Sequence, residues 1–182
     1  MSIIWVGIGV DEQLQSVHER IAVVEERLAL SNSNLTLPLH ISLKMSFAVE
    51  ESAEGAVMAA LESYFRGLNP FQIPVKGPEY LGTIAWVRMQ DNPTLNTIHD
   101  ELNEMLYTRF GVGLHEYDRD YMFHTTLFMD QDAEKVRAGY EAMLGEPLPD
   151  TLLAERFLIG ASETGALGSF RVVREIFVKS TP

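Results

Sequence analysis

Hydrophobic residues recur along the chain with two different periods, and these periods alternate from one end to the other. Apolar residues spaced three or four positions apart form one face of an amphipathic helix, whereas alternation at every second position is typical of a strand. The first pattern predicts four helices, at Asp11–Leu30, at Ser52–Phe65, from Asn92 to Leu106 and at Asp132–Leu144. The second pattern predicts seven strands, at Ile3–Val10, Leu37–Val49, Phe71–Lys76, Ile84–Gln90, Tyr121–Met129, Leu152–Ile159 and Phe170–Val178.

Residue types at the ends of the helices support these boundaries. Asp11 can cap the first helix, and the polar segment from Ser31 to Asn34 is expected to end it. Asn92 and Pro93 combine a capping side chain with a proline at the first helical position, where no helical hydrogen bond is lost. The glycine-rich stretch from Gly160 to Gly168 is expected to join the last two strands as a hairpin loop.

The order of the elements repeats, which indicates two similar halves. Strand, helix, strand, helix, strand occurs twice, and the second copy begins at the strand Ile84–Gln90. Two such halves favour an α+β fold, with antiparallel sheets that face one another and helices packed outside. No linker or low-complexity tract divides the chain, so residues 1–182 are expected to form a single domain.

Composition narrows the function classes. The chain has no cysteine, which excludes disulfides, thiolate catalysis and cysteine-based metal sites and suits a cytoplasmic protein. No apolar run approaches the length needed to span a membrane. The formal net charge of -12 disfavours binding to a long nucleic acid, because proteins that grip the phosphate backbone carry basic faces. A small phosphorylated substrate or an RNA terminus remains compatible, provided that the pocket itself is neutral or positive.

Two short segments share one motif. His40-Ile41-Ser42-Leu43 and His124-Thr125-Thr126-Leu127 both read His, any residue, Ser or Thr, Leu, and the histidines are 84 positions apart. On a strand, every second side chain shares a face, so each histidine is expected to lie beside its hydroxyl residue. The same alternation would add Lys44 to the first face and Phe128 to the second. Lys44 is therefore the candidate for a positive charge in the pocket, although a solvated lysine at a strand edge fits the sequence equally.

Two imidazoles with two hydroxyls suit the cleavage of a phosphodiester. One neutral imidazole can accept a proton from water or a ribose hydroxyl, while the other, protonated, donates to the leaving oxygen. Ser42 and Thr126 can donate hydrogen bonds to the phosphate oxygens, where negative charge develops. This scheme needs neither a metal nor a cofactor. A single such histidine would be read as a buried residue bonded to a neighbouring hydroxyl, but the matched pair favours function.

The two motifs resemble those of the 2H phosphoesterase superfamily, which includes bacterial 2′-5′ RNA ligase-like proteins and RNA 2′,3′-cyclic phosphodiesterases. The resemblance implies two pseudo-symmetric α+β lobes, intertwined in sequence, with His40 and His124 in a central groove. It further implies a hydrolase in which these histidines are catalytic and Ser42, Thr126 and Lys44 bind substrate. Many members have proline shortly before the second histidine, where this chain has Met122 and Phe123.

Other readings remain open at the level of sequence. The same groove could hold a nucleotide or phosphorylated ligand without turnover, or the chain could be an exonuclease that trims RNA ends, which its charge disfavours. His18 and His99 are interpreted as residues on the flanks of their helices, without a metal role. The polar stretch from Gly111 to Asp120, which contains His115, is interpreted as a solvated loop that could also cover the pocket.

Overall fold

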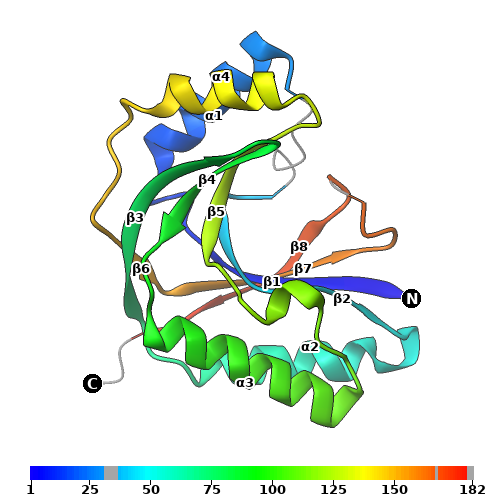
Figure 1. The fold of residues 1–182 in the computed structure, drawn as a ribbon. Coiled ribbons are helices and arrows are strands. Elements are labelled where there is room, and N and C mark those ends of the chain that lie inside the picture. Colours follow the sequence, from blue (N-terminus) through cyan, green and yellow to red (C-terminus); the bar gives the residue numbers. More distant parts are fainter. Residues whose placement is uncertain (31–36, 167, 180–182) are drawn as a thin grey trace.

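The structure is a computed structural model that describes residues 1–30, 37–166 and 168–179 (Figure 1). The α-helices in these residues are α1 Gln15–Leu28, α2 Glu51–Arg66, α3 Pro93–Phe110 and α4 Ala133–Met143, with a short 3₁₀ helix, η2, at Glu116–Asp118. The strands are β1 Ser2–Gly9, β2 His40–Val49, β3 Phe71–Leu81, β4 Ile84–Met89, β5 His124–Met129, β6 Thr151–Ala154, β7 Arg156–Ser162 and β8 Arg171–Phe177. None of the helices in the described part of the chain is both long and apolar enough to cross a membrane.

The strands form two antiparallel sheets of four strands each. The first sheet has the order β2-β1-β7-β8 and the second has the order β5-β4-β3-β6. Helices α2 and α3 pack on the first sheet, and α1 and α4 pack on the second (Figure 1). We call each sheet with its two helices a lobe, the first and the second. The predicted α+β fold, with two sheets facing a central groove and helices outside, is confirmed.

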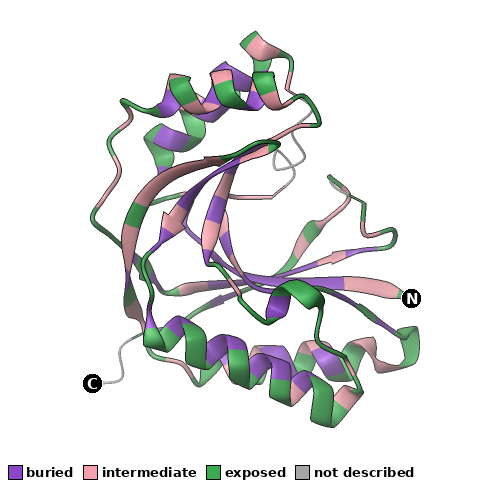
Figure 2. Ribbon diagram, viewed as in Figure 1, coloured by how far each residue is buried: buried purple, intermediate pink, exposed green. Residues whose placement is uncertain are grey.

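The helices cross between the lobes. Helix α1 follows β1 of the first sheet but packs on the second, and α3 follows β4 of the second sheet but packs on the first. The apolar sides of both sheets and of all four helices are buried, and their side chains form one continuous hydrophobic cluster (Figure 2). Burial of each large aliphatic side chain contributes about 1.5–3 kcal/mol, so the shared core ties the two lobes together.

The predicted strand Leu152–Ile159 is wrong in one respect, because the structure divides it into two strands. Residues 151–154 form β6 and pair with β3 in the second sheet, whereas residues 156–162 form β7 and pair with β1 in the first. Both parts are largely apolar and only Glu155 and Arg156 stand between them, so the sequence pattern does not mark a break. The chain changes sheets at Glu155, whose carbonyl accepts a hydrogen bond from Val178.

The strand predicted at Phe71–Lys76 continues to Leu81 as β3. Gly77, with φ of 131°, lies at a register shift where a β-bulge accommodates the Gly77-Pro78 pair. Glycine takes this conformation without the steric penalty of a side chain, so the strand bends and continues instead of ending. Gly82 then forms the turn that joins β3 to β4 as a hairpin.

Of the predicted helix caps, the structure confirms Asn92 but not Asp11. The Asn92 side chain accepts hydrogen bonds from the N–H groups of Thr94 and Leu95, and Asp132 caps α4 in the same way. Asp11, in contrast, does not cap α1, which begins only at Gln15, and its carboxylate pairs with Arg156 instead. The segment from Ser31 to Asn34, predicted to end the first helix, lies outside the described residues.

Candidate active site

A β-bulge in β2 determines which residues of the first motif reach the groove. Gly7 and Val6 are neighbours on β1, but their partners on β2 are Ser42 and Lys44, so Leu43 is an extra residue. A bulge interrupts the alternation of faces. His40 and Ser42 are therefore partly exposed on the groove side, whereas Leu43 and Lys44 are both buried.

The second motif has a bulge at the equivalent place. Trp86 and Ala85 are neighbours on β4, but they pair with Thr126 and Phe128 on β5, which makes Leu127 the extra residue. The burial pattern repeats that of β2, with the histidine and Thr126 partly exposed and both Leu127 and Phe128 buried. The two motifs are thus matched in backbone geometry as well as in residue type.

The predicted placement of Lys44 on the face of His40 and Ser42 is wrong, because the bulge turns its side chain away from the groove. The Lys44 side chain is 1% exposed, and its ammonium donates to Asp118 Oδ2 and Asn103 Oδ1, both at 2.6 Å. The positive charge of Lys44 is therefore paired inside the protein and does not face the groove. Phe128, expected on the face of His124, is buried for the same reason.

The two histidines are oriented by matching backbone contacts. His40 Nδ1 lies 2.8 Å from the carbonyl oxygen of Pro38, and His124 Nδ1 lies 2.6 Å from that of Met122. A carbonyl oxygen can only accept, so Nδ1 carries the hydrogen in both rings. Each neutral imidazole thus keeps the basic atom Nε2 for exchange of a proton with a ligand.

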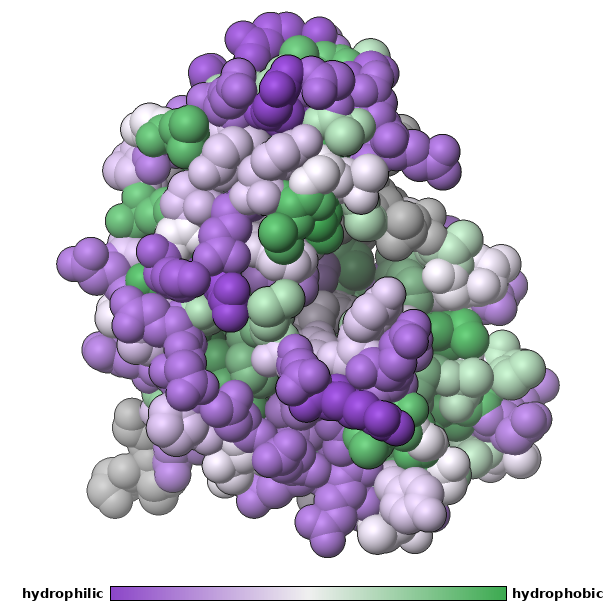
Figure 3. Space-filling view, in the orientation of Figure 1, coloured by the Kyte–Doolittle hydropathy of each residue, from purple (hydrophilic) through white to green (hydrophobic). Residues whose placement is uncertain are grey.

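The structure brings the two histidines close to each other. They lie on β2 and β5, the strands through which the two sheets contact each other. They are close enough for the charge of His124 to act on the pKa of His40. The space-filling view shows a hollow between the two lobes in the middle of the molecule (Figure 3).

Burial shifts the acid–base equilibrium of both rings toward the neutral form. It lowers the pKa of His40 to about 4, with the hydrogen bond to Pro38 acting in the opposite direction and the nearby His124 adding to the decrease. The pKa of His124 is lowered as well, chiefly by burial and further by the positive charge of Arg88, while the hydrogen bond to Met122 opposes the decrease. Both histidines are therefore neutral at neutral pH when the groove is empty.

A tryptophan packs against each histidine, a feature that the motif alone does not predict. The rings of Trp5 and His40 meet edge to face with centroids 4.3 Å apart, and those of Trp86 and His124 are 4.1 Å apart. Both indoles are buried, so they support the histidines from behind. The chain has only two tryptophans, and each lies on the strand next to a motif strand. This placement is the one feature of the sequence that could have indicated their contact with the histidines.

Trp5 also holds Ser42. Its indole N–H donates to Ser42 Oγ at 2.9 Å, so the hydroxyl hydrogen of Ser42 must point elsewhere. The indole lies across Gly7 and Gly160, where any Cβ atom would come within 2.5 and 2.7 Å of its ring. These two glycines therefore make room for the side chain that positions the first motif.

A buried polar cluster joins the segment before His124 to the first motif. Asp118 of η2 binds Lys44 and accepts from the backbone N–H groups of Met45 at 3.1 Å and His115 at 2.9 Å. His99 does not lie on the flank of its helix as predicted, because its ring is buried between the carbonyl oxygens of Leu43 and Asp118. The segment 111–120, predicted to be a solvated loop, is thus held against β2 by the buried side chain of Asp118.

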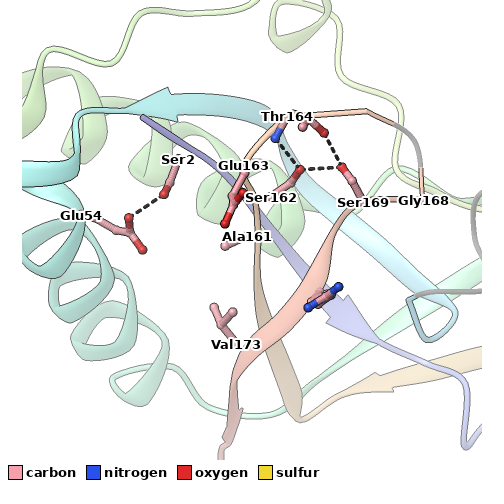
Figure 4. A pocket seen from close by; sticks show the side chains of 10 residues that line it. Ser2, Glu54, Ala161, Ser162, Glu163, Thr164, Gly168, Ser169 and Val173 are labelled. Atoms are coloured by element: carbon pink, nitrogen blue, oxygen red, sulfur yellow. Dashed lines mark hydrogen bonds between the residues drawn. The ribbon is translucent and has the colours of Figure 1, made fainter.

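A cavity of about 450 Å³ lies apart from the histidines, at the opposite end of β2 (Figure 4). Its polar side chains bond to one another, as Ser162 does with Ser169 at 2.5 Å and Ser2 with Glu54 at 2.6 Å. These contacts stabilise the end of the first sheet, and the cavity takes no part in the site around His40. Within the described residues, no group of three or more His, Asp or Glu side chains is arranged to hold a metal ion.

Comparisons with known proteins agree with this architecture. Solved structures with a similar fold include E. coli LigT complexed with 3′-AMP, at 14% identity and a TM-score of 0.57, covering 98% of this chain and 99% of LigT. The protein TT0787 of Thermus thermophilus is 15% identical, with a TM-score of 0.60 and coverage of 96% and 97%. A search of curated proteins found no match. The model of the 2′-5′ RNA ligase superfamily matches residues 10–159, a range that includes both histidine motifs. The chain therefore belongs to the 2′-5′ RNA ligase superfamily, among the 2H phosphoesterases that its two motifs resemble.

Proposed function

We propose that this protein is a metal-independent phosphodiesterase that hydrolyses a small cyclic or 2′-5′ phosphodiester by general acid–base catalysis with His40 and His124. The observation that supports the proposal is the matched pair of imidazoles, each held through Nδ1 by a backbone carbonyl, which keeps Nε2 for proton transfer. A binding protein would have no use for two proton-transfer groups oriented in this way.

In the proposed reaction, one neutral imidazole takes a proton from water through Nε2, and the water oxygen attacks phosphorus. The bond from phosphorus to the leaving ribose oxygen breaks, and that oxygen receives a proton from Nε2 of the other, protonated imidazole. A phosphomonoester and a free hydroxyl result. Ser42 and Thr126 lie beside the histidines on the groove side and donate hydrogen bonds to the non-bridging oxygens.

The expected substrate is small. The net charge of -12 opposes binding of a long nucleic acid, while a nucleotide or an RNA terminus presents only one or two phosphates. Structures of E. coli LigT complexed with 3′-AMP, NADP+ and ATP support a ligand of this size in a protein of the same fold. No membrane association is proposed.

The test is hydrolysis of nucleoside 2′,3′-cyclic phosphates and 2′-5′ dinucleotides, with and without EDTA. We expect turnover to survive EDTA, and His40→Ala and His124→Ala to lower it by roughly 10²- to 10⁴-fold each. The double variant should be little worse than either single variant, because the two histidines act as a unit. His18→Ala, at an exposed position of α1, is the matched control and should keep the wild-type rate.

Three outcomes would contradict the proposal. Loss of turnover in EDTA with recovery on adding one divalent metal would exclude the metal-independent mechanism. Near-normal turnover in both His40→Ala and His124→Ala would show that the pair is structural. Tight binding of a nucleotide with no turnover on any of these substrates would favour a binding module that uses the same groove.

A further inference from the structure

The second lobe places an arginine beside His124 that lies outside both histidine motifs. Arg88 of β4 is the register partner of His124 on β5. Partners on adjacent antiparallel strands share a face, and their Cβ atoms lie about 4.5–5.5 Å apart. The register with His124 places Arg88 on the His124 side of the groove, and its side chain is 34% exposed, so it remains accessible to a ligand.

Arg88 is only loosely held by the protein. In the described part of the chain, its guanidinium makes one hydrogen bond, to Glu79 Oε2 at the long distance of 3.5 Å. A guanidinium has five N–H donors, so most of its hydrogen-bonding capacity remains for a ligand. Glu79 has closer partners, because Lys76 donates to it at 2.8 Å and the indole of Trp86 at 3.3 Å.

The corresponding arginine on the first lobe is already neutralised. The Arg156 guanidinium lies over Gly9, the register partner of His40, where a Cβ atom would approach its Nε to 2.5 Å. It pairs with both Asp11 and Glu12, and its side chain is only 12% exposed. The two sides of the groove therefore differ: carboxylates prevail beside His40, and positive charge prevails beside His124.

The charge of Arg88 reaches the catalytic histidine. Burial is the main cause of the lowered pKa of His124, and the positive charge of Arg88 lowers that pKa further. The pKa of Glu79 is also lowered, chiefly by the hydrogen bond from Lys76, so this residue is a carboxylate at neutral pH. Lys76, Arg88 and Glu79 together leave a net positive charge at this edge of a strongly acidic protein.

We propose that Arg88 binds the phosphate group of the substrate on the His124 side of the groove, and that Glu79 is its counter-ion while the groove is empty. The identity of that phosphate as part of a phosphodiester rests on the function proposed above. The planar guanidinium matches two phosphate oxygens at once, which a lysine cannot do. Arg88 thus supplies the positive charge that the sequence pattern assigned to Lys44.

Binding of inorganic phosphate and of adenosine 3′-monophosphate, measured by calorimetry on the full chain, tests this inference without any need for turnover. We expect Arg88→Gln to weaken both ligands by about 10- to 100-fold, the range for loss of charge-assisted hydrogen bonds. Arg88→Lys should lose a smaller part of the affinity, because lysine keeps the positive charge but lacks the planar guanidinium that contacts two phosphate oxygens at once. Glu79→Gln should tighten both ligands several-fold, because it releases Arg88.

Arg174→Gln is the matched control, because Arg174 is an exposed arginine that pairs with Glu62 of α2 on the outer side of the first sheet. It should bind both ligands as the wild type does. Wild-type affinity in Arg88→Gln, or weaker binding in Glu79→Gln, would overturn the inference. The Glu79→Gln variant tests the inference even if Arg88→Gln does not fold. Hydrolysis with unchanged phosphate affinity in Arg88→Gln would defeat this inference alone. Arg88-dependent phosphate binding without hydrolysis would defeat only the proposed function.

Discussion

The buried pair of Lys44 and Asp118 offers the sharpest test of how the structure is held together. Their side chains are 1% and 0% exposed, and Nζ lies 2.6 Å from Oδ2. Burial alone would raise the pKa of Asp118, but hydrogen bonds from Lys44, His115 and Met45 outweigh it and hold the pKa below its usual value. Asp118→Ala would therefore leave an ammonium in the interior whose hydrogen bonds to described residues are reduced to the one with Asn103.

The expected cost follows from those contacts. Removing one member of a buried ion pair destabilises a protein by about 3–5 kcal/mol, since the other charge stays desolvated. Asp118→Ala also strips the acceptor from two backbone N–H groups, at Met45 and His115, each worth ~1–3 kcal/mol if left unsatisfied. These terms overlap, so we expect a loss of about 5 kcal/mol. That is a large share of the ~5–15 kcal/mol that stabilises a typical domain.

Urea denaturation followed by circular dichroism measures this loss. Lys44→Met should cost less than Asp118→Ala, because the carboxylate keeps its two backbone donors. The double variant should be more stable than Asp118→Ala alone, because it contains no unpaired buried ammonium. Arg137→Ala, which removes an exposed pair with Glu134, is the control and should cost at most ~1 kcal/mol. A cost below about 1 kcal/mol for Asp118→Ala, or strictly additive costs in the double variant, would refute the reasoning.

Three further predictions concern the site. Because the pKa values of His40 and His124 are both lowered, one protonated and one neutral ring coexist mainly below about pH 6.5. The pH profile of kcat/KM should therefore have its maximum below about pH 6.5, and a maximum above about pH 7 would contradict this prediction. Gly7→Ala would place a Cβ atom 2.5 Å from the Trp5 ring, and denaturation should show a loss of about 1–3 kcal/mol. Trp5→Phe removes the hydrogen bond to Ser42, so kcat should fall several-fold with KM nearly unchanged, and an unchanged kcat would argue against a positioning role.

Periodicity predicted the helices and the general fold because amphipathic stripes and caps are local. Asn92, for example, caps α3 through N–H groups two and three residues away, a contact that depends on no other part of the chain. The pairing of His40 with Ser42, and of His124 with Thr126, on one face follows from the same kind of local rule. The family resemblance added the expectation that both faces meet in one groove.

What the sequence could not provide depends on partners far along the chain. The bulge at Leu43 forms against β1, and no local pattern marks it, so alternation was extended wrongly to Lys44. The apolar residue at the matching position of the second motif, Phe128, was the one hint that this position faces the core. Arg88 was missed because its importance comes only from its register with His124, which lies 36 positions later.

The crossing of α1 and α3 between the lobes has a consequence for how the chain acquires its structure. The first sheet combines β1 and β2 with β7 and β8 from the C-terminal end of the chain. The second sheet likewise contains β3, which precedes the start of the second half at Ile84. Neither half of the chain can therefore cover its own apolar surfaces before the other has been synthesised. Contacts between residues distant in sequence slow folding, because long loops must close before those contacts form. We expect a single cooperative transition with slow refolding, and fragments that gain structure only when both are present together.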